Sequence, residues 1–281
     1  MSTGTFFETV AKRAARSRVC LELLQRHRSD HHLHKAAQKG VLYHRKVVDA
    51  TADEVAGYVL NINEYAKLYG KEYWASVLEE TIAYIRDVGR NGTWIPVIVE
   101  CAGAKVGPHW RPDAVLRMPG VHAVIVNPYK KSPHPIGLCL LQSEKGVLVK
   151  CRTVVPCERT MQGKPVTLGG GPRAVQAPMY ECIARQAATD WNLNGNCGLV
   201  VDPTDPEELE RVRQVADGVP VLVSDCRTSE RVHSALCGAN RQKHMTLLHL
   251  NTLGDQFVGK RFEWKLRDHL ADLNAAAVQY H

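Results

Sequence analysis

The chain has 281 residues, of which 44% are hydrophobic and 23% are charged, a composition typical of a globular protein with a full hydrophobic core. Its formal net charge of +7 permits contact with nucleic acid or an anionic surface, although dispersed, solvated lysines explain that charge better. No apolar run approaches the roughly 18–20 residues that cross a bilayer, which argues against an integral membrane protein.

The nine cysteines form no CxxC pair, and most lie in or beside apolar runs. This pattern indicates free thiols in a reducing, intracellular compartment, with neither a disulfide framework nor a zinc site. Residues 1–19 are basic, as in a mitochondrial presequence, but the spacing of Phe6, Val10 and Ala14 favours a first amphipathic helix. A mitochondrial location is left open.

Eight short apolar segments predict β-strands, and the stretches between them are long enough for helices. Helical spacing is evident over 72–89, 178–192 and 205–218. Eight such β–α alternations indicate a (β/α)₈ TIM barrel that occupies residues 1–281 as a single domain with an N-terminal helix. The predicted strands are 18–23, 55–60, 95–100, 121–126, 146–151, 197–201, 219–224 and 246–250.

Barrels of this kind carry their sites at the carboxyl ends of the strands. Polar residues follow several of the predicted strands, and these are the first candidates for a site. They are Glu22, Asn61, Glu100 to Lys105, Asn127, Thr153, Asp202, Asp225 and Asn251.

The stretch "WNLNGNCGLVVDPTDPEELERVR" (191–213) resembles the run WNxNGNxGLVVGATxPEELxRVR of the orotidine 5′-monophosphate decarboxylase family, in its long bacterial and protist branch. Further matches follow the family order over nearly the whole chain, at 49–58, 78–87, 126–129, 151–153 and 169–172. The resemblance implies a barrel of the decarboxylase type.

The same resemblance shows that positions of the family's catalytic residues have changed. Leu24 stands where the family has a ribose-binding aspartate, and Val59 replaces a lysine of the second strand. The third strand ends in ECAGAKVG against the family's DAKRGDIG. Glu100 therefore keeps a carboxylate, whereas Ala102 replaces the proton-donating lysine and Lys105 replaces the second aspartate.

Positions that bind substrate in the family have changed as well. Val154 replaces a base-binding serine, Ser229 a glutamine of the phosphate loop, and Gly254 a phosphate-binding arginine. One catalytic group can contribute about 10²–10⁴-fold to a rate, so the combined loss predicts a catalytically inactive pseudoenzyme. No catalytic or substrate-binding residue is assigned, and no metal or cofactor is expected.

The leading hypothesis is thus an inactive decarboxylase-like barrel that serves as a structural or accessory subunit of a larger assembly, such as a mitochondrial respiratory or ribosomal complex. One alternative is an enzyme with altered chemistry on a small phosphorylated substrate, which requires an open polar pocket not filled by Leu24, Val59 and Val154. The other is an RNA-contacting barrel with salt-dependent binding. Its basic candidates are Arg241, Lys243, Lys260 and Arg261. Whether the family's homodimer persists is left open.

Three further patterns are weaker candidates. An acid–base couple of Glu100 and Lys105 is better explained as a rim salt bridge, and a Cys101–His109 nucleophile pair as a structural cysteine. The histidine-rich stretch 27–34 lacks the ligand company of a metal site and is better explained as a solvated connection.

Overall fold

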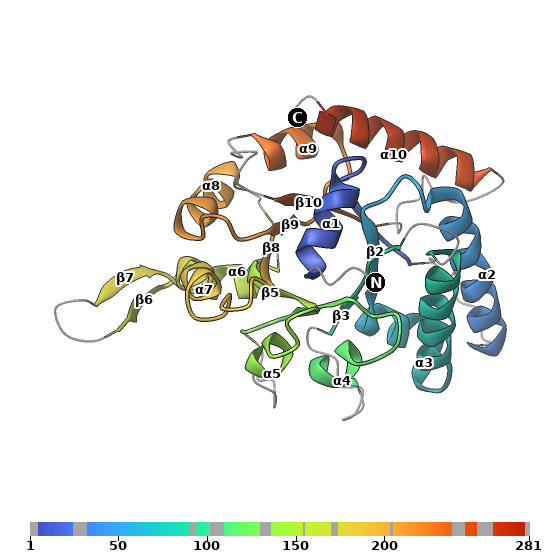
Figure 1. Ribbon diagram of the computed structural model, residues 1–281, viewed down its shortest axis with the longest axis horizontal. Helices are drawn as coiled ribbons and strands as arrows, with labels where there is room; N and C mark the ends of the chain where they lie inside the picture. Colours follow the sequence, from blue (N-terminus) through green and yellow to red (C-terminus); the bar gives the residue numbers. More distant parts are fainter. Residues whose placement is uncertain are drawn as a thin grey trace.

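A computed structural model describes residues 5–24, 33–89, 94–101, 110–129, 136–153, 155–169, 174–202, 205–237, 245–251 and 261–278. Eight parallel strands close into a barrel in the order β1-β10-β9-β8-β5-β4-β3-β2 (Figure 1). The predicted (β/α)₈ barrel is confirmed, with each of the eight predicted strands in place. The barrel strands are β1 (Val19–Glu22), β2 (Gly57–Asn61), β3 (Val97–Glu100), β4 (Ala123–Val126), β5 (Gly146–Arg152), β8 (Cys197–Val201), β9 (Val221–Val223) and β10 (Thr246–Asn251).

Helices surround the barrel and include those predicted from helical spacing. The predicted start of the third is confirmed: Pro206 occupies the first turn of α8, and the Asp205 side chain accepts a hydrogen bond from the backbone N–H of Glu207 at 3.0 Å. The helices are α1 (Phe6–Ala14), α2 (Leu33–Thr51), α3 (Ile62–Gly89), α4 (Pro112–Leu116), α5 (Ile136–Leu140), α6 (Pro156–Gln162), α7 (Met179–Ala188), α8 (Pro206–Val215), α9 (Ser229–Leu236) and α10 (Phe262–Val278).

The barrel interior has an apolar lower layer and a polar upper layer. Side chains two residues apart on a strand point the same way. The residue two positions after each inward-facing apolar residue of the lower layer therefore also points into the barrel. The lower layer contains Cys20, Val59, Ile98, Ile125, Leu148, Val200, Leu222 and Leu247. Two positions on stand Glu22, Asn61, Glu100, Asn127, Lys150, Asp202, Ser224 and His249. The polar layer therefore lies toward the carboxyl ends of the strands.

Helix α1 closes the opposite end of the barrel. Phe6, Phe7 and Val10 are buried in the same cluster as the lower layer, and Figure 1 shows α1 lying across the barrel. Gly198 admits Phe7 because a Cβ at that position would come within 2.7 Å of the ring Cζ. The basic N-terminal stretch is thus an integral helix of the fold, as its apolar spacing predicted.

A two-stranded antiparallel hairpin was missed in the sequence. Its strands are β6 (Pro165–Leu168) and β7 (Val175–Pro178), and it extends away from the barrel (Figure 1). It falls between β5 and the helix predicted over 178–192, which is α7.

Two properties of the chain bear on its surroundings. All nine cysteines are free thiols. Among the described residues, no helix is long and apolar enough to cross a membrane.

Candidate active site at the barrel mouth

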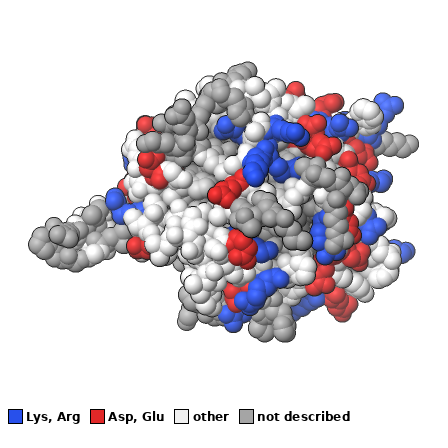
Figure 2. Space-filling model, viewed as in Figure 1, with Lys and Arg blue, Asp and Glu red and all other residues white. Residues whose placement is uncertain are grey.

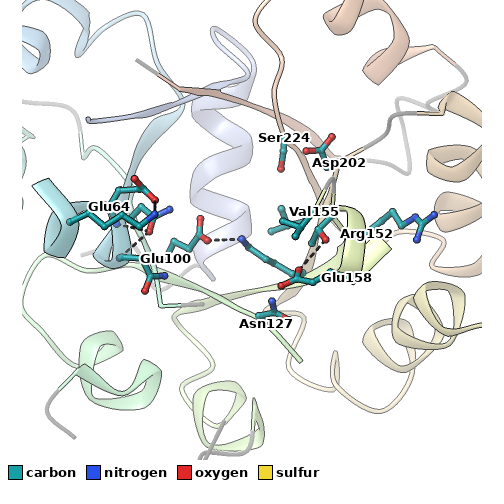
Figure 3. A pocket seen from close by; sticks show the side chains of 14 residues that line it. Glu64, Glu100, Asn127, Arg152, Val155, Glu158, Asp202 and Ser224 are labelled. Carbon is teal, nitrogen blue, oxygen red and sulfur yellow. Dashed lines mark hydrogen bonds and ion pairs between the residues drawn. The ribbon is translucent and has the colours of Figure 1, made fainter. Parts of the chain in front are cut away.

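A cavity of about 430 Å³ opens at the carboxyl ends of the strands, within the usual size range of small-molecule sites. Its wall is built from the polar upper layer, including Asn61, Glu100, Asn127, Lys150, Asp202 and Ser224 (Figure 3). Because these side chains come from six different strands or strand ends, barrel closure is what brings them together. The position agrees with the expectation for a TIM barrel.

An ion pair between Lys150 and Glu100 crosses the cavity. The ammonium Nζ of Lys150, on β5, lies 2.6 Å from Oε1 of Glu100, at the end of β3 (Figure 3). The Glu100 side chain is 10% exposed and that of Lys150 is 22% exposed. A charge-assisted hydrogen bond in such a sheltered place is stronger than one at an open surface, so the pair presents a fixed ammonium and carboxylate to any ligand of the cavity.

A second charged pair lies beside the first, between β1 and β10. Nε2 of His249 is 3.1 Å from Oε2 of Glu22, and the Asn251 amide donates a hydrogen bond to the same oxygen at 3.1 Å. Burial opposes a charge on His249, but the hydrogen bond and attraction of Glu22, with help from Glu100, outweigh it and raise the pKa of His249 above its ordinary value. The pair thus favours the protonated form of His249 within the polar layer, close to Glu100 and Lys150.

The arginine at the cavity edge is committed to the scaffold. Arg152 binds the carboxylate of Glu208 on α8 at 2.7 Å, and Arg159 binds the same carboxylate at 2.6 Å. The Arg152 guanidinium also donates to the Arg159 carbonyl at 2.6 Å. These contacts fix α6 and α8 against the end of β5, and they occupy the Arg152 guanidinium with bonds to the scaffold.

Asp202 and Ser224 complete the wall between β8 and β9. Burial, followed by the negative charge of Asp225, raises the pKa of Asp202 to about 6. Figure 3 shows Asp202 beside Ser224, across the cavity from Glu64 and Glu100. The site thus has a Lys–Glu pair across it and an additional carboxylate in the wall beside Ser224.

The changed family positions are placed in different ways. Leu24 and Val59 are buried, and neither lines the cavity; Val59 lies in the apolar layer below it. Ser229 is exposed at the start of α9 and does not line the cavity either. Four positions fall outside the described residues, namely Ala102, Lys105, Val154 and Gly254. Leu24 and Val59 therefore leave the mouth open.

Among the weaker candidates, Glu100 does form an ion pair, with Lys150. Burial raises the pKa of Cys101 well above the ordinary thiol value, as expected of a structural cysteine and not of a nucleophile. His109 and residues 27–32 lie outside the described ranges. Across the described part of the chain, no group of three or more His, Cys, Asp or Glu side chains is arranged to hold a metal ion.

Sequence reasoning missed Lys150 and His249. Both lie inside predicted strands, "GVLVKC" and "TLLHL", and not among the polar residues at the strand ends. The alternation of side chains along a strand could have identified both residues, because each lies two residues after an inward-facing leucine, Leu148 or Leu247. A charged residue at such a position points into the barrel.

A closed β/α barrel with charged pairs at the carboxyl ends of its strands defines a TIM-barrel protein with a small-molecule site in its mouth. No protein-family model matches the chain. It is 33% identical over 226 residues to orotidine 5′-phosphate decarboxylase of Aromatoleum aromaticum, covering 79% of this chain and 77% of that protein. The chain belongs to the orotidine 5′-phosphate decarboxylase family.

Other relatives agree over a shorter span. The Halorubrum lacusprofundi orotidine 5′-phosphate decarboxylase is 36% identical over 183 residues, which cover 64% of this chain and 59% of that protein. The chain thus spans about three fifths of the length of this relative and of the one from Variovorax paradoxus, where the share is 61%.

Solved structures show the same fold. The Leishmania donovani OMP decarboxylase superposes with a TM-score of 0.72 at 22% identity, covering 98% of this chain and 99% of that one. A putative orotidine 5′-phosphate decarboxylase from Streptomyces avermitilis gives a TM-score of 0.68 at 17% identity over 100% and 97% of the two chains.

The prediction of an inactive structural subunit in a mitochondrial assembly is wrong, because the relatives that establish the family are decarboxylases, which are enzymes. The physical reason for the error is that lysine was sought only at the family's own positions, on the second and third strands. In a barrel, an ammonium on β5 reaches the same mouth, as Lys150 does when it pairs with Glu100.

The RNA-contacting alternative has no support either. Arg241, Lys243 and Lys260 lie outside the described residues, and Arg261 is exposed just before α10. Figure 2 shows lysines and arginines interspersed with acidic residues over the described part of the visible face, the arrangement of solvated surface charges.

Proposed function

We propose that this protein is a decarboxylase that removes a carboxylate from a small acidic substrate, for which the orotidine 5′-phosphate named in its relatives is the first compound to test. The observation that carries the proposal is the Lys150–Glu100 pair inside the cavity of the barrel mouth. An ammonium and a carboxylate held together in a sheltered pocket are the two groups that a cofactor-independent decarboxylation requires.

Each group has a distinct part in the reaction. A substrate carboxylate placed beside Glu100 is repelled by that like charge, and the repulsion disappears when the carboxylate leaves as CO₂. As the carbon–carbon bond breaks, its electron pair remains on the substrate carbon, where the Lys150 ammonium stabilises the developing negative charge. Transfer of a proton from Nζ to that carbon completes the product. Uptake of one proton from solvent then restores the Lys150 ammonium, so each turnover consumes one proton and releases one CO₂.

The structure supports this division because the two groups differ in exposure. Glu100, with 10% of its side chain exposed, is held against one wall, whereas Lys150 at 22% is more accessible to a ligand. In the adjacent pair, His249 has Glu22 as its carboxylate partner. Glu100 is therefore the carboxylate that pairs with Lys150. Lys150 therefore remains available as both an electrostatic group and a proton donor.

The test is release of labelled CO₂ from orotidine 5′-phosphate carrying an isotopic label in its carboxylate. We expect turnover by the purified chain and a loss of about 10²–10⁴-fold in kcat for Lys150→Met. Lys71→Met is the matched control, because Lys71 is exposed on α3 and does not line the cavity. Absence of turnover in the wild-type protein, or equal rates for the two variants, would contradict the proposal.

A further inference from the structure

Asp202 is a buried residue with one carboxylate oxygen that the described part of the scaffold leaves unsatisfied. It follows β8 directly and is 6% exposed. Its Oδ1 atom is shielded and has no hydrogen-bond partner among the described residues. The backbone holds the residue in place, because the Asp202 N–H donates to the carbonyl of Arg152 at 2.8 Å. A buried acceptor without a donor costs free energy, so such groups are uncommon unless they have a use.

The charges around Asp202 do not compensate it. The negative charge of Asp225 adds to the effect of burial on Asp202. Asp225 itself pairs with two arginines, Arg227 and Arg231. The Arg231 guanidinium lies 3.6 Å from the Asp225 carboxylate. Arg159, a further cation in the vicinity, pairs with Glu208. The cations near Asp202 are therefore held mainly by other carboxylates.

The fold does not require this carboxylate. In the run that matches the family, "GLVVD" of this chain stands against GLVVG, so Asp202 occupies a glycine position. Its Oδ1 atom has no hydrogen-bond donor among the described residues, yet the residue lines the cavity together with Ser224. A polar group that is unsatisfied in the empty protein and adjacent to a ligand cavity is explained if the ligand supplies the missing donor.

We propose that Asp202 is a specificity-determining residue that accepts a hydrogen bond from an N–H or O–H donor of the bound substrate. The inference rests on the proposed function for the identity of the ligand, a pyrimidine nucleotide. Asp202 acts in recognition and not in the bond-breaking step, which belongs to Lys150 and Glu100. Its hydrogen bond selects ligands that place a donor at the end of β8, beside the Ser224 hydroxyl.

The first measurement is thermal stability without ligand, for Asp202→Asn and for the control Asp190→Asn, which changes an exposed aspartate after α7. If the carboxylate serves the ligand, Asp202→Asn raises Tm by about 2 °C or more, because it removes an uncompensated buried charge. A structural carboxylate gives the reverse result, a lowered Tm. The Asp190 variant leaves Tm unchanged.

The second measurement is calorimetric binding of uridine 5′-phosphate and of three analogues, each lacking one donor: the N3-methyl, 2′-deoxy and 3′-deoxy forms. With the wild-type protein, one analogue binds about 10- to 100-fold more weakly than the parent. With Asp202→Asn that difference shrinks to less than threefold, which identifies the donor that Asp202 accepts. The Asp190→Asn protein keeps the wild-type pattern.

The two proposals fail separately. Binding without turnover of orotidine 5′-phosphate overturns the decarboxylase proposal alone. Turnover together with an unchanged analogue pattern and a lowered Tm in Asp202→Asn overturns the role of Asp202 alone. A wild-type protein that neither binds the nucleotides nor turns over the substrate overturns both.

Discussion

The Lys150–Glu100 ion pair is expected to contribute to stability as well as to chemistry, and a double-mutant cycle measures that contribution. The variants are Glu100→Gln, Lys150→Met and the double change. Lys150→Met removes the ammonium that lies 2.6 Å from the Glu100 carboxylate, and it leaves that carboxylate unpaired in a side chain that is only 10% exposed. Removing one partner of a fully buried pair costs about 3–5 kcal/mol, and breaking an exposed pair costs about 0.2–1 kcal/mol.

The structure places this pair between those limits. Lys150 retains 22% exposure and faces a cavity, so water partly replaces it beside Glu100 in the variant. We therefore expect a coupling energy of about 2 kcal/mol, measured from urea unfolding of the four proteins at pH 7 and low salt. The double variant should be more stable than the sum of the single changes implies, because neither charge is left alone.

The control is the exposed pair Arg211–Glu207 on α8, with 53% and 76% exposure and a separation of 3.7 Å. Its cycle should give less than about 0.5 kcal/mol. A coupling energy for Lys150 and Glu100 as small as that of the control would refute the reasoning, since it would mean that the cavity screens charges as well as bulk water does.

Three further predictions concern packing and pH. Gly198→Ala should lower the free energy of unfolding by about 1–3 kcal/mol, because its Cβ would meet Phe7 at 2.7 Å. Phe7→Leu should restore part of the loss. Equal stability of Gly198→Ala and wild type would show that α1 shifts freely. His249 has a raised pKa in the folded protein. Protonation of His249 therefore stabilises the fold fully below its ordinary pKa, and this stabilisation disappears as pH rises through the pKa of the folded protein. Glu22→Gln should lower that pKa in an NMR titration, and an unchanged titration curve would contradict the assignment. Asp202 has a pKa of about 6 in the folded protein. Burial and Asp225 raise this pKa, whereas Arg231, Arg159 and His249 lower it. The folded protein therefore binds this proton more tightly than the unfolded chain, so Asp202 becomes destabilising as pH rises from about 4 to 6. Urea unfolding at pH 4.5 and 7.5 should show that Asp202→Asn gains more stability at the higher pH; a gain equal at both would argue against the shift.

The barrel could be predicted from the sequence because its strands are buried on both faces and appear as short apolar runs, such as 95–100 and 121–126. The mouth could be predicted in part for a related reason. Polar residues directly after those runs, among them Asn61, Glu100 and Asp202, do line the cavity. Topology alone locates them, since parallel strands carry their carboxyl ends to one side.

Partnerships across the barrel could not be predicted in this way. Lys150 and Glu100 are fifty residues apart and lie on strands that are not neighbours, so their contact depends on barrel geometry and side-chain length. Position-by-position comparison with the family motifs, which takes no account of residues on other strands, led to the prediction of inactivity. The β6–β7 hairpin could not be predicted either, because its strands pair with each other outside the barrel and none of their side chains with described burial is buried.

Helix α1 has a consequence for the order of folding. Its buried face, formed by Phe6, Phe7 and Val10, packs against residues contributed by strands from β1 to β10. β1 itself needs β10 as one of its neighbours, because Val19 pairs with Leu248. Helix α1 is synthesised before all the strands of this barrel, so it has no complete docking surface until β10 has been made. Burial of Phe6 and Phe7 is accordingly a late event, and it reports that the ring of strands has closed.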